Sequence, residues 1–90
     1  MRVTKKDILL RWMLQRGTFR TSDVLLWGIS NFHNRSDRDK RDFAQEGIII
    51  ALNDNQKKEI GLTTTEGVYM TKNKYESRFK HPQMEFVFNQ

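Results

Sequence analysis

Arginine and glutamine side chains recur on one side of a stretch that we predict to be helical, residues 36–47 (SDRDKRDFAQEG). We place Phe43 at the centre of the inward face and advance by about 100° per residue. Arg38, Arg41 and Gln45 then point within about 40° of the opposite direction. Such side chains reach both phosphates and base edges. The spacing therefore predicts one outward stripe suited to a nucleic-acid groove.

Two charged residues of the same stretch, Asp39 and Lys40, fall toward the inward side, where apolar residues are usual. The segment is also mixed in charge, because residues 33–42 hold four Lys/Arg against three Asp. A solvated helix face therefore remains the alternative interpretation of its charges. The small residues Ser36 and Gly47 lie near the inward side, where they permit close packing.

Residue types that start and end helices divide this region into two short helices. Ser36 is a good N-cap, and Asp39 stands three positions later as a capping-box partner. Gly47 suits the left-handed position after a helix. The preceding helix begins near Ser22 and is expected to be largely buried, and residues 31–35 (NFHNR) form the polar turn between the two.

The flanking segments predict further elements. A first helix runs from about residue 4 to Gly17, with Ile8, Leu9, Trp12 and Met13 on one buried stripe. After the second and third helices, residues 48–52 (IIIAL) read as a buried strand. A polar turn over residues 53–58 then ends in two lysines, and residues 59–64 return as the second strand of a hairpin. We expect Trp12, Trp27 and Phe43 in the core.

The segment from Ser22 to Gly67 resembles a winged helix-turn-helix DNA-binding domain of the small transcription-regulator type. The matching motifs are SDVLLWGI, SDRDKRDFAQEGIII and LTTTEG, the last similar to the L-T-x-x-G end of a second wing strand. The resemblance implies an α+β fold, with a three-helix core and a β-hairpin wing, that binds double-stranded DNA. Asp39 and Lys40 depart from the pattern, since such families usually place apolar residues there.

The C-terminal part predicts a fourth helix and a short strand. The helix begins at Thr64 or Thr65 and runs to about Lys80, before Pro82. Large apolar residues then alternate at Met84, Phe86 and Phe88, which is typical of a half-buried strand. This helix and strand either form a homodimer interface or complete the monomer's own sheet.

Composition limits the classes of function. The chain has 90 residues, a formal charge of +5, a pI near 9.8 and no cysteine. That length predicts a single domain over residues 1–90, with the helix-turn-helix at about 22–47, the wing at about 48–64 and the C-terminal elements at about 65–88. His33 and His81 match no zinc spacing, and we expect no metal and no cofactor. No run is apolar enough to cross a bilayer, so we expect a cytoplasmic or nucleoid-associated protein without a membrane partner.

The sequence-based hypothesis is a small, sequence-specific, double-stranded DNA-binding regulator of transcription that is not an enzyme, since no catalytic motif is present. The expected DNA contacts are made by Arg35, Arg38, Arg41, Gln45, Lys57 and Lys58. Three of them face the major groove, and Arg35 and the two lysines contact phosphates. The alternative is a protein-interaction module on the same scaffold, for example a small viral inhibitor of host machinery, that binds no DNA.

Overall fold

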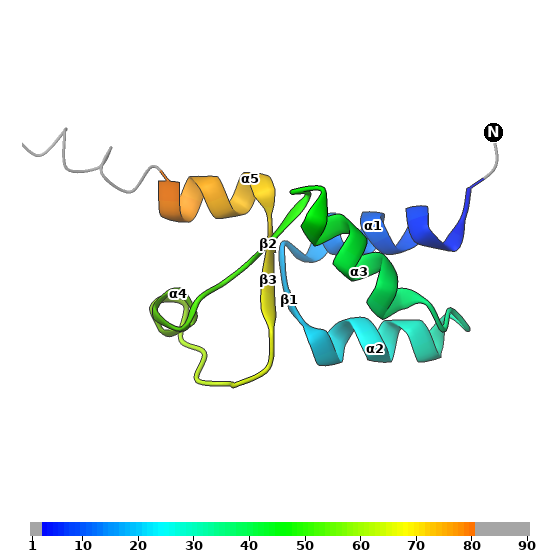
Figure 1. The fold of residues 1–90 in the computed structure, drawn as a ribbon, viewed down its shortest axis with the longest axis horizontal. Helices are drawn as coiled ribbons and strands as arrows, with labels where there is room; N and C mark the ends of the chain where they lie inside the picture. Colours follow the sequence, from blue (N-terminus) through cyan, green and yellow to red (C-terminus); the bar gives the residue numbers. More distant parts are fainter. Residues whose placement is uncertain (1–2, 81–90) are drawn as a thin grey trace, which may run out of the picture.

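The computed structural model describes residues 3–80 of the chain, which form an α+β fold of helices around a small antiparallel sheet (Figure 1). The elements follow in the order α1 (Lys5–Arg16), β1 (Thr18–Arg20), α2 (Thr21–Ser30), α3 (Ser36–Gln45), β2 (Ile49–Ala51), α4 (Asp54–Glu59), β3 (Val68–Thr71), α5 (Lys72–Tyr75) and the π-helical turn η1 (Glu76–Lys80). No helix within these residues has the length and apolar character needed to span a membrane.

The sheet brings together three strands that are far apart in the sequence. Its order is β1–β3–β2, and β3 pairs antiparallel with both neighbours. Met70 of β3 stands opposite Thr18 of β1 on one side and Ile50 of β2 on the other. Helices α1, α2 and α3 lie on one side of the sheet in Figure 1, and α4 and α5 lie on the other. The sheet therefore separates two small cores.

The larger core lies among the first three helices and β1. Its buried side chains come from all of these elements and from β2, and they are Leu9, Met13, Phe19, Val24, Phe43 and Ile49. The predicted burial of Phe43 is confirmed, at 4% exposure. Trp12 and Trp27 are only half-buried and pack against this core from its edge, with their ring centroids 6.4 Å apart. The expectation that both tryptophans are core residues was therefore too strong.

A second, smaller core lies between the sheet and the C-terminal helices. Leu52, Val68 and Met70 are buried there, and Ile60, Leu62, Tyr75 and Phe79 pack against them. Phe79 belongs to η1, and its ring centroid lies 5.1 Å from that of Tyr75. This core holds α4 and α5 onto the sheet.

The helix ends match the sequence in part. Gly17 and Gly47 have φ values of 75° and 81°, as predicted for left-handed positions after α1 and α3. Ser36, however, is the first helical residue of α3 and no cap, because Arg35 occupies the N-cap. It is buried against Gly28 of α2, where an added Cβ would lie only 2.3 Å from the Ser36 hydroxyl oxygen. Ser22 is likewise inside α2, whose N-cap is Arg20.

The predicted wing is wrong in detail. Residues 53–58 do not form a simple turn, because Asn53 caps α4 and exchanges hydrogen bonds with Gln56 in a capping box. Residues 59–64 form no strand, and the strand that pairs with β2 is β3, at Val68–Thr71. The predicted C-terminal helix accordingly begins at Lys72, not at Thr64 or Thr65. The predicted strand at 84–88 lies outside the described residues.

Candidate nucleic-acid interface

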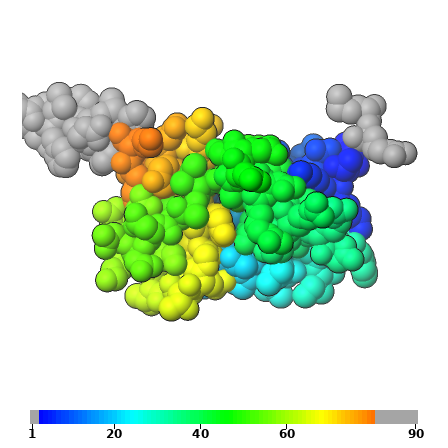
Figure 2. Space-filling model, viewed as in Figure 1, coloured from blue at the N-terminus to red at the C-terminus, as the bar shows by residue number. Residues whose placement is uncertain are grey.

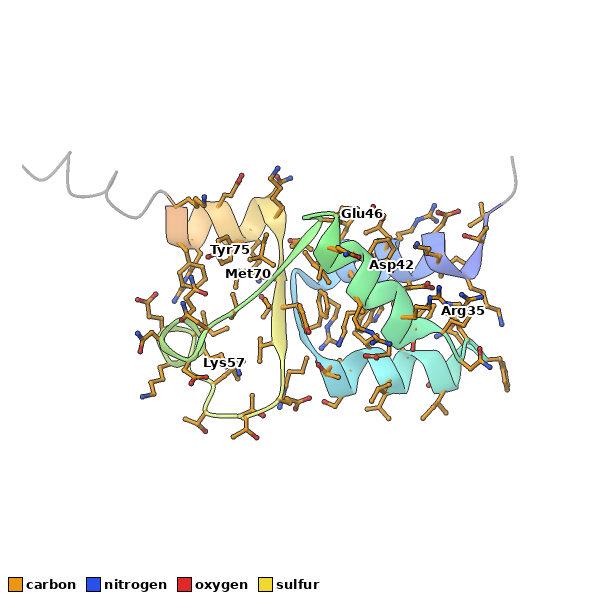
Figure 3. All side chains as sticks on the ribbon, in the orientation of Figure 1. Arg35, Asp42, Glu46, Lys57, Met70 and Tyr75 are labelled. Atoms are coloured by element: carbon orange, nitrogen blue, oxygen red, sulfur yellow. The ribbon has the colours of Figure 1, made fainter. Side chains whose placement is uncertain are left out.

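Helix α3 presents the predicted stripe to solvent. Arg38, Arg41 and Gln45 are all exposed, and the Arg41 side chain is 71% accessible. Arg35 is exposed at the N-terminal end of the same helix, and Figure 3 shows it at the opposite end of α3 from Glu46. Four of the six predicted contact residues therefore lie on or beside one exposed helix.

The inward side of α3 carries the two charges that its sequence pattern left unexplained. Asp39 is 6% exposed and Lys40 is 4% exposed. Oδ2 of Asp39 lies 2.6 Å from Nε2 of His33, in the turn that precedes α3. The expectation of Asp39 as a capping-box partner is therefore wrong, because its carboxylate is engaged by this imidazole.

Lys40 has three partners around its ammonium group. Its Nζ lies 3.0 Å from Oδ1 of Asp37, 3.4 Å from Oγ1 of Thr21 and 4.8 Å from the centre of the Tyr69 ring. A buried charge is costly unless it is paired and hydrogen-bonded. Lys40 satisfies that condition by joining α3 to the start of α2 and to β3. These contacts hold α3 in the orientation that turns its arginines outward.

Charges on the outward side of α3 are mixed. Nε of Arg41 lies 3.5 Å from a carboxylate oxygen of Asp37, one turn earlier. Arg35 and Arg38 form no ion pair within residues 3–80. Asp42 is partly neutralised by Lys6 of α1, at 3.3 Å. The arginines nearest the start of α3 are thus the ones most available to an anionic ligand.

The two lysines of α4 have different environments, although they are adjacent in sequence. Lys58 is exposed and lines a hollow of about 400 Å³ beside Thr63, Thr64 and Thr65. Lys57 is 7% exposed, and its Nζ donates a hydrogen bond to the backbone carbonyl of Glu66 over 2.9 Å. The ammonium group of Lys57 is turned into the protein, which argues against its predicted contact with phosphate.

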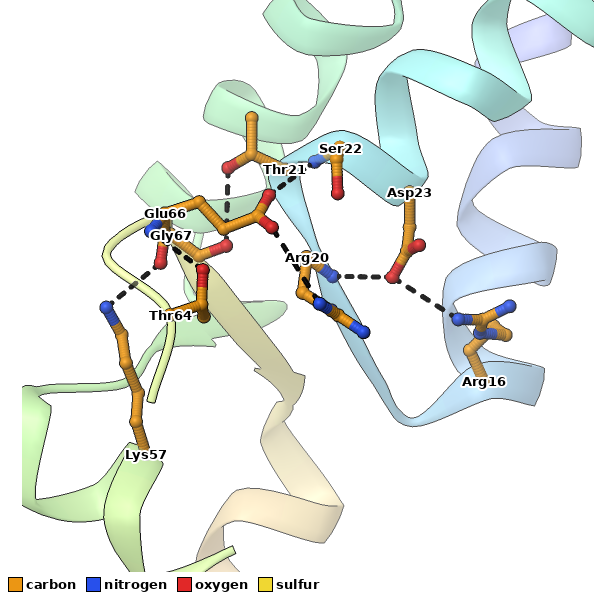
Figure 4. A network of polar contacts seen from close by, with 9 residues as sticks. All are labelled: Arg16, Arg20, Thr21, Ser22, Asp23, Lys57, Thr64, Glu66 and Gly67. Carbon is orange, nitrogen blue, oxygen red and sulfur yellow. Dashed lines mark hydrogen bonds and ion pairs between the residues drawn. The ribbon is translucent and has the colours of Figure 1, made fainter. Parts of the chain in front are cut away.

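A polar network that no sequence motif predicts ties α2 to the segment before β3 (Figure 4). The Ser22 N–H donates to Oε1 of Glu66 over 2.9 Å, and the Thr21 N–H donates to the carbonyl of Gly67 over 3.0 Å. These bonds satisfy free N–H groups of the first turn of α2. The hydrogen bond from the Ser22 backbone lowers the pKa of the Glu66 carboxyl below its usual range. The network joins α2 to the segment that leads into β3, and Lys57 joins α4 to the same segment.

In the space-filling view, α3 and the α4 region share the face toward the viewer (Figure 2). Arg38, Arg41 and Gln45 belong to α3 and Arg35 is its N-cap, whereas Lys58 belongs to a separate element, α4.

Within residues 3–80 no group of three or more His, Asp or Glu side chains is arranged to hold a metal ion. His33, the histidine in that range, is engaged with Asp39 at the base of α3. The exposed arginines and the Gln45 amide of α3 are hydrogen-bond donors that can bind an anionic ligand. Comparisons of this chain with protein-family models, with curated proteins and with solved structures found no match.

Proposed function

We propose that this protein is a winged helix-turn-helix domain that binds double-stranded DNA with sequence preference, as a small regulator of transcription. The observation that carries the proposal is the two-sided character of α3. Phe43 and the paired charges Asp39 and Lys40 are buried, whereas Arg38 and Arg41 are exposed on the same helix.

The order of the elements supports the proposal. Helix α2, a short turn and α3 are followed by β2 and β3, and the connection between these strands carries α4 and the exposed Lys58. A helix pair followed by two paired strands is the arrangement that the winged-helix resemblance implies. In this chain the wing contains a short helix in place of a plain loop.

The proposed DNA contacts are of two kinds: contacts to base edges, which recognise sequence, and contacts to phosphates, which position the protein. Arg38, Arg41 and Gln45 enter the major groove, where Arg pairs with guanine edges and Gln with adenine edges. Arg35 and Lys58 contact phosphates, which fix register without reading sequence. The net charge of +5 favours association with any duplex, so the sequence preference rests on the three groove-facing side chains.

The test begins with selection of a preferred duplex from a random library, followed by affinity measurements at several salt concentrations. Arg41→Ala should weaken binding to the selected duplex by about 1–3 kcal/mol and binding to random duplex by much less. Lys58→Ala should weaken both about equally and reduce the slope of log affinity against log salt by about 1. Arg11→Ala, which removes an exposed cation from α1, is the matched control.

Two outcomes would contradict the proposal at different levels. If the folded protein shifts no duplex at micromolar concentration and low salt, DNA binding is wrong. If it binds but Arg41→Ala lowers affinity for both duplexes equally, DNA binding stands and the assignment of the α3 stripe as the reading face is wrong. Circular dichroism of each variant establishes that the fold is intact.

A further inference from the structure

Helix α2 and the turn after it leave a row of large apolar side chains exposed in the described part of the chain. Leu25 is 47% exposed, Leu26 61%, Ile29 74% and Phe32, in the turn after the helix, 88%. The expectation that this helix is largely buried was therefore wrong, since only Val24 and Gly28 are fully buried. We call these four exposed residues the α2 apolar face. Contiguous apolar patches on small proteins commonly mark interaction sites.

Phe32 is unfavourable for the isolated protein in two respects. Its side chain gains almost nothing from burial, and its φ of 55° lies in the left-handed region, which bulky residues avoid. The position is the one after the α2 C-cap, and the His33 N–H donates to the Gly28 carbonyl over 2.8 Å as the helix ends. Gly or Asn normally occupies this position. A strained, exposed phenylalanine indicates a function outside the monomer.

A hollow of about 600 Å³ has the exposed Phe32 as one of its lining residues. Its lining is mainly apolar or uncharged and consists of Leu25, Gly28, Ile29, Phe32, His33, Asn34 and Ser36. One surface thus carries both a projecting aromatic ring and an apolar depression. A two-fold contact requires such self-complementarity, because each copy offers the same patch to the other.

The charge pattern indicates which kind of partner binds the α2 apolar face. Residues 24–34 (VLLWGISNFHN) contain no Asp, Glu, Lys or Arg, although 30% of the chain is charged. Near a two-fold axis every charge would face its own copy, and with a net charge of +5 most surfaces would repel one another. The four side chains of the α2 apolar face carry no charge and avoid that repulsion, and the neighbouring cation Lys5 of α1 is held by the Phe32 carbonyl, to which its Nζ donates over 2.7 Å. A partner selected by opposite charge would instead require charged residues within this stretch.

The exposed area is sufficient for the centre of a dimer interface. One phenylalanine and three aliphatic side chains offer on the order of 400 Å² of apolar surface. A standard interface buries about 800 Å² on each partner, with an apolar centre and a polar rim. The α2 apolar face is large enough to be such a centre.

We propose that the α2 apolar face binds a second copy of this chain, as a two-fold dimer in which Phe32 of each copy enters the hollow of the other. The proposal does not depend on DNA binding, because none of the four residues belongs to the outward stripe of α3. It would place two α3 helices in one assembly.

Sedimentation equilibrium of the full chain across a range of concentrations tests the proposal. The unmodified protein should dimerise reversibly, and Leu26→Lys should raise the dissociation constant at least about 100-fold, because the two copies of the new ammonium group meet near the axis. Leu14→Lys is the matched control, since Leu14 is 57% exposed on α1 and should leave the dissociation constant unchanged.

A cysteine scan gives an independent readout, because the chain contains no cysteine. Ile29→Cys should form an intermolecular disulfide readily under mild oxidation, whereas Leu14→Cys should not. A protein that stays monomeric up to about 1 mM overturns the proposal. So does a dimer that resists Leu26→Lys, since its interface must then lie elsewhere. A monomer that binds a different protein through these residues would replace the second copy as occupant and also overturn it.

Discussion

His33 and Asp39 are joined by a 2.6 Å contact between imidazole Nε2 and carboxylate Oδ2, with side chains only 13% and 9% exposed. The pair links the turn after α2 to the inward side of α3. The Trp27 ring packs edge-on against the same imidazole, with centroids 5.9 Å apart. The His33–Asp39 pair, packed against the Trp27 ring, thus fixes the angle between α2 and α3. An apolar contact is more usual at such a position.

Removing one member of this pair should destabilise the fold clearly. Asp39→Ala leaves a buried imidazole without its partner, which should lower the free energy of unfolding by about 1–3 kcal/mol. Asp42→Ala, also in α3 but 40% exposed in its ion pair with Lys6, should cost less than about 1 kcal/mol. Urea denaturation measures both. The double variant His33→Ala/Asp39→Ala should lose less than the sum of the single losses, and strict additivity would show that the pair is not coupled.

The two adjacent lysines of α4 provide a second matched comparison. Lys57→Met keeps most of the buried stem but removes the donor to the Glu66 carbonyl, so it should cost about 1–3 kcal/mol of stability. Lys58→Met changes an exposed side chain and should stay within about 0.5 kcal/mol of the parent. Thermal or urea unfolding of the two variants checks the difference. Equal stabilities would mean that the ammonium group of Lys57 does not bond to the Glu66 carbonyl.

Because of Glu66, the free energy of unfolding should decrease as the pH is lowered in the acid range. The hydrogen bond from the Ser22 backbone holds the pKa of this carboxyl below its ordinary value of about 4.5. A depressed pKa in the folded state contributes stability that is present above the unfolded pKa. That contribution is lost as pH falls from about 4.5 through the lower folded value. Glu66→Gln should be less stable than the parent near pH 7 and should show a shallower loss on acidification, measured by urea titrations at stepped pH.

Replacing Phe32 by a residue that tolerates left-handed geometry should make the monomer more stable. Asn tolerates left-handed geometry better than Phe, so Phe32→Asn should raise the free energy of unfolding by about 0.5–1 kcal/mol when measured at dilution. Phe32→Ala removes the ring without easing the backbone and serves as the control. The same Asn variant should dimerise less well. A lower stability of Phe32→Asn in dilute solution would indicate that the ring is packed within the monomer.

Helical periodicity predicted the α3 face correctly, because which side of a helix a residue occupies follows from spacing alone. The same geometry placed Asp39 and Lys40 inward. Their partners did not follow from it, since His33 and Tyr69 reach them only through the packing of other elements. Periodicity does not show how much of α2 is buried. A row of apolar residues has the same spacing whether it packs into the core or faces solvent.

The region after β2 was harder to predict. Asn53 and Gln56 stand at capping-box spacing, so the sequence does contain a local signal for α4. Residues 68–71 (VYMT) are rich in strand-forming types, but their spacing with Tyr75 and Phe79 also fits a helix. Strand pairing decides between the two, because β1 and β2 both use β3 as their partner. This pairing is a property of the tertiary structure, so it cannot be recognised in a short stretch of sequence.

The position of β3 in the sheet sets the order in which the fold can be completed. Both outer strands pair with β3, and it follows them in the chain by 17 residues from the end of β2 and by 48 from the end of β1. Until residues 68–71 leave the ribosome, neither outer strand has the neighbour it pairs with in the native sheet. The three N-terminal helices can associate before that, because their mutual contacts need no residue later than 45 and local contacts form quickly. Because β3 is the partner of both β1 and β2, the two halves of the molecule are joined in the sheet only when this one strand is in place.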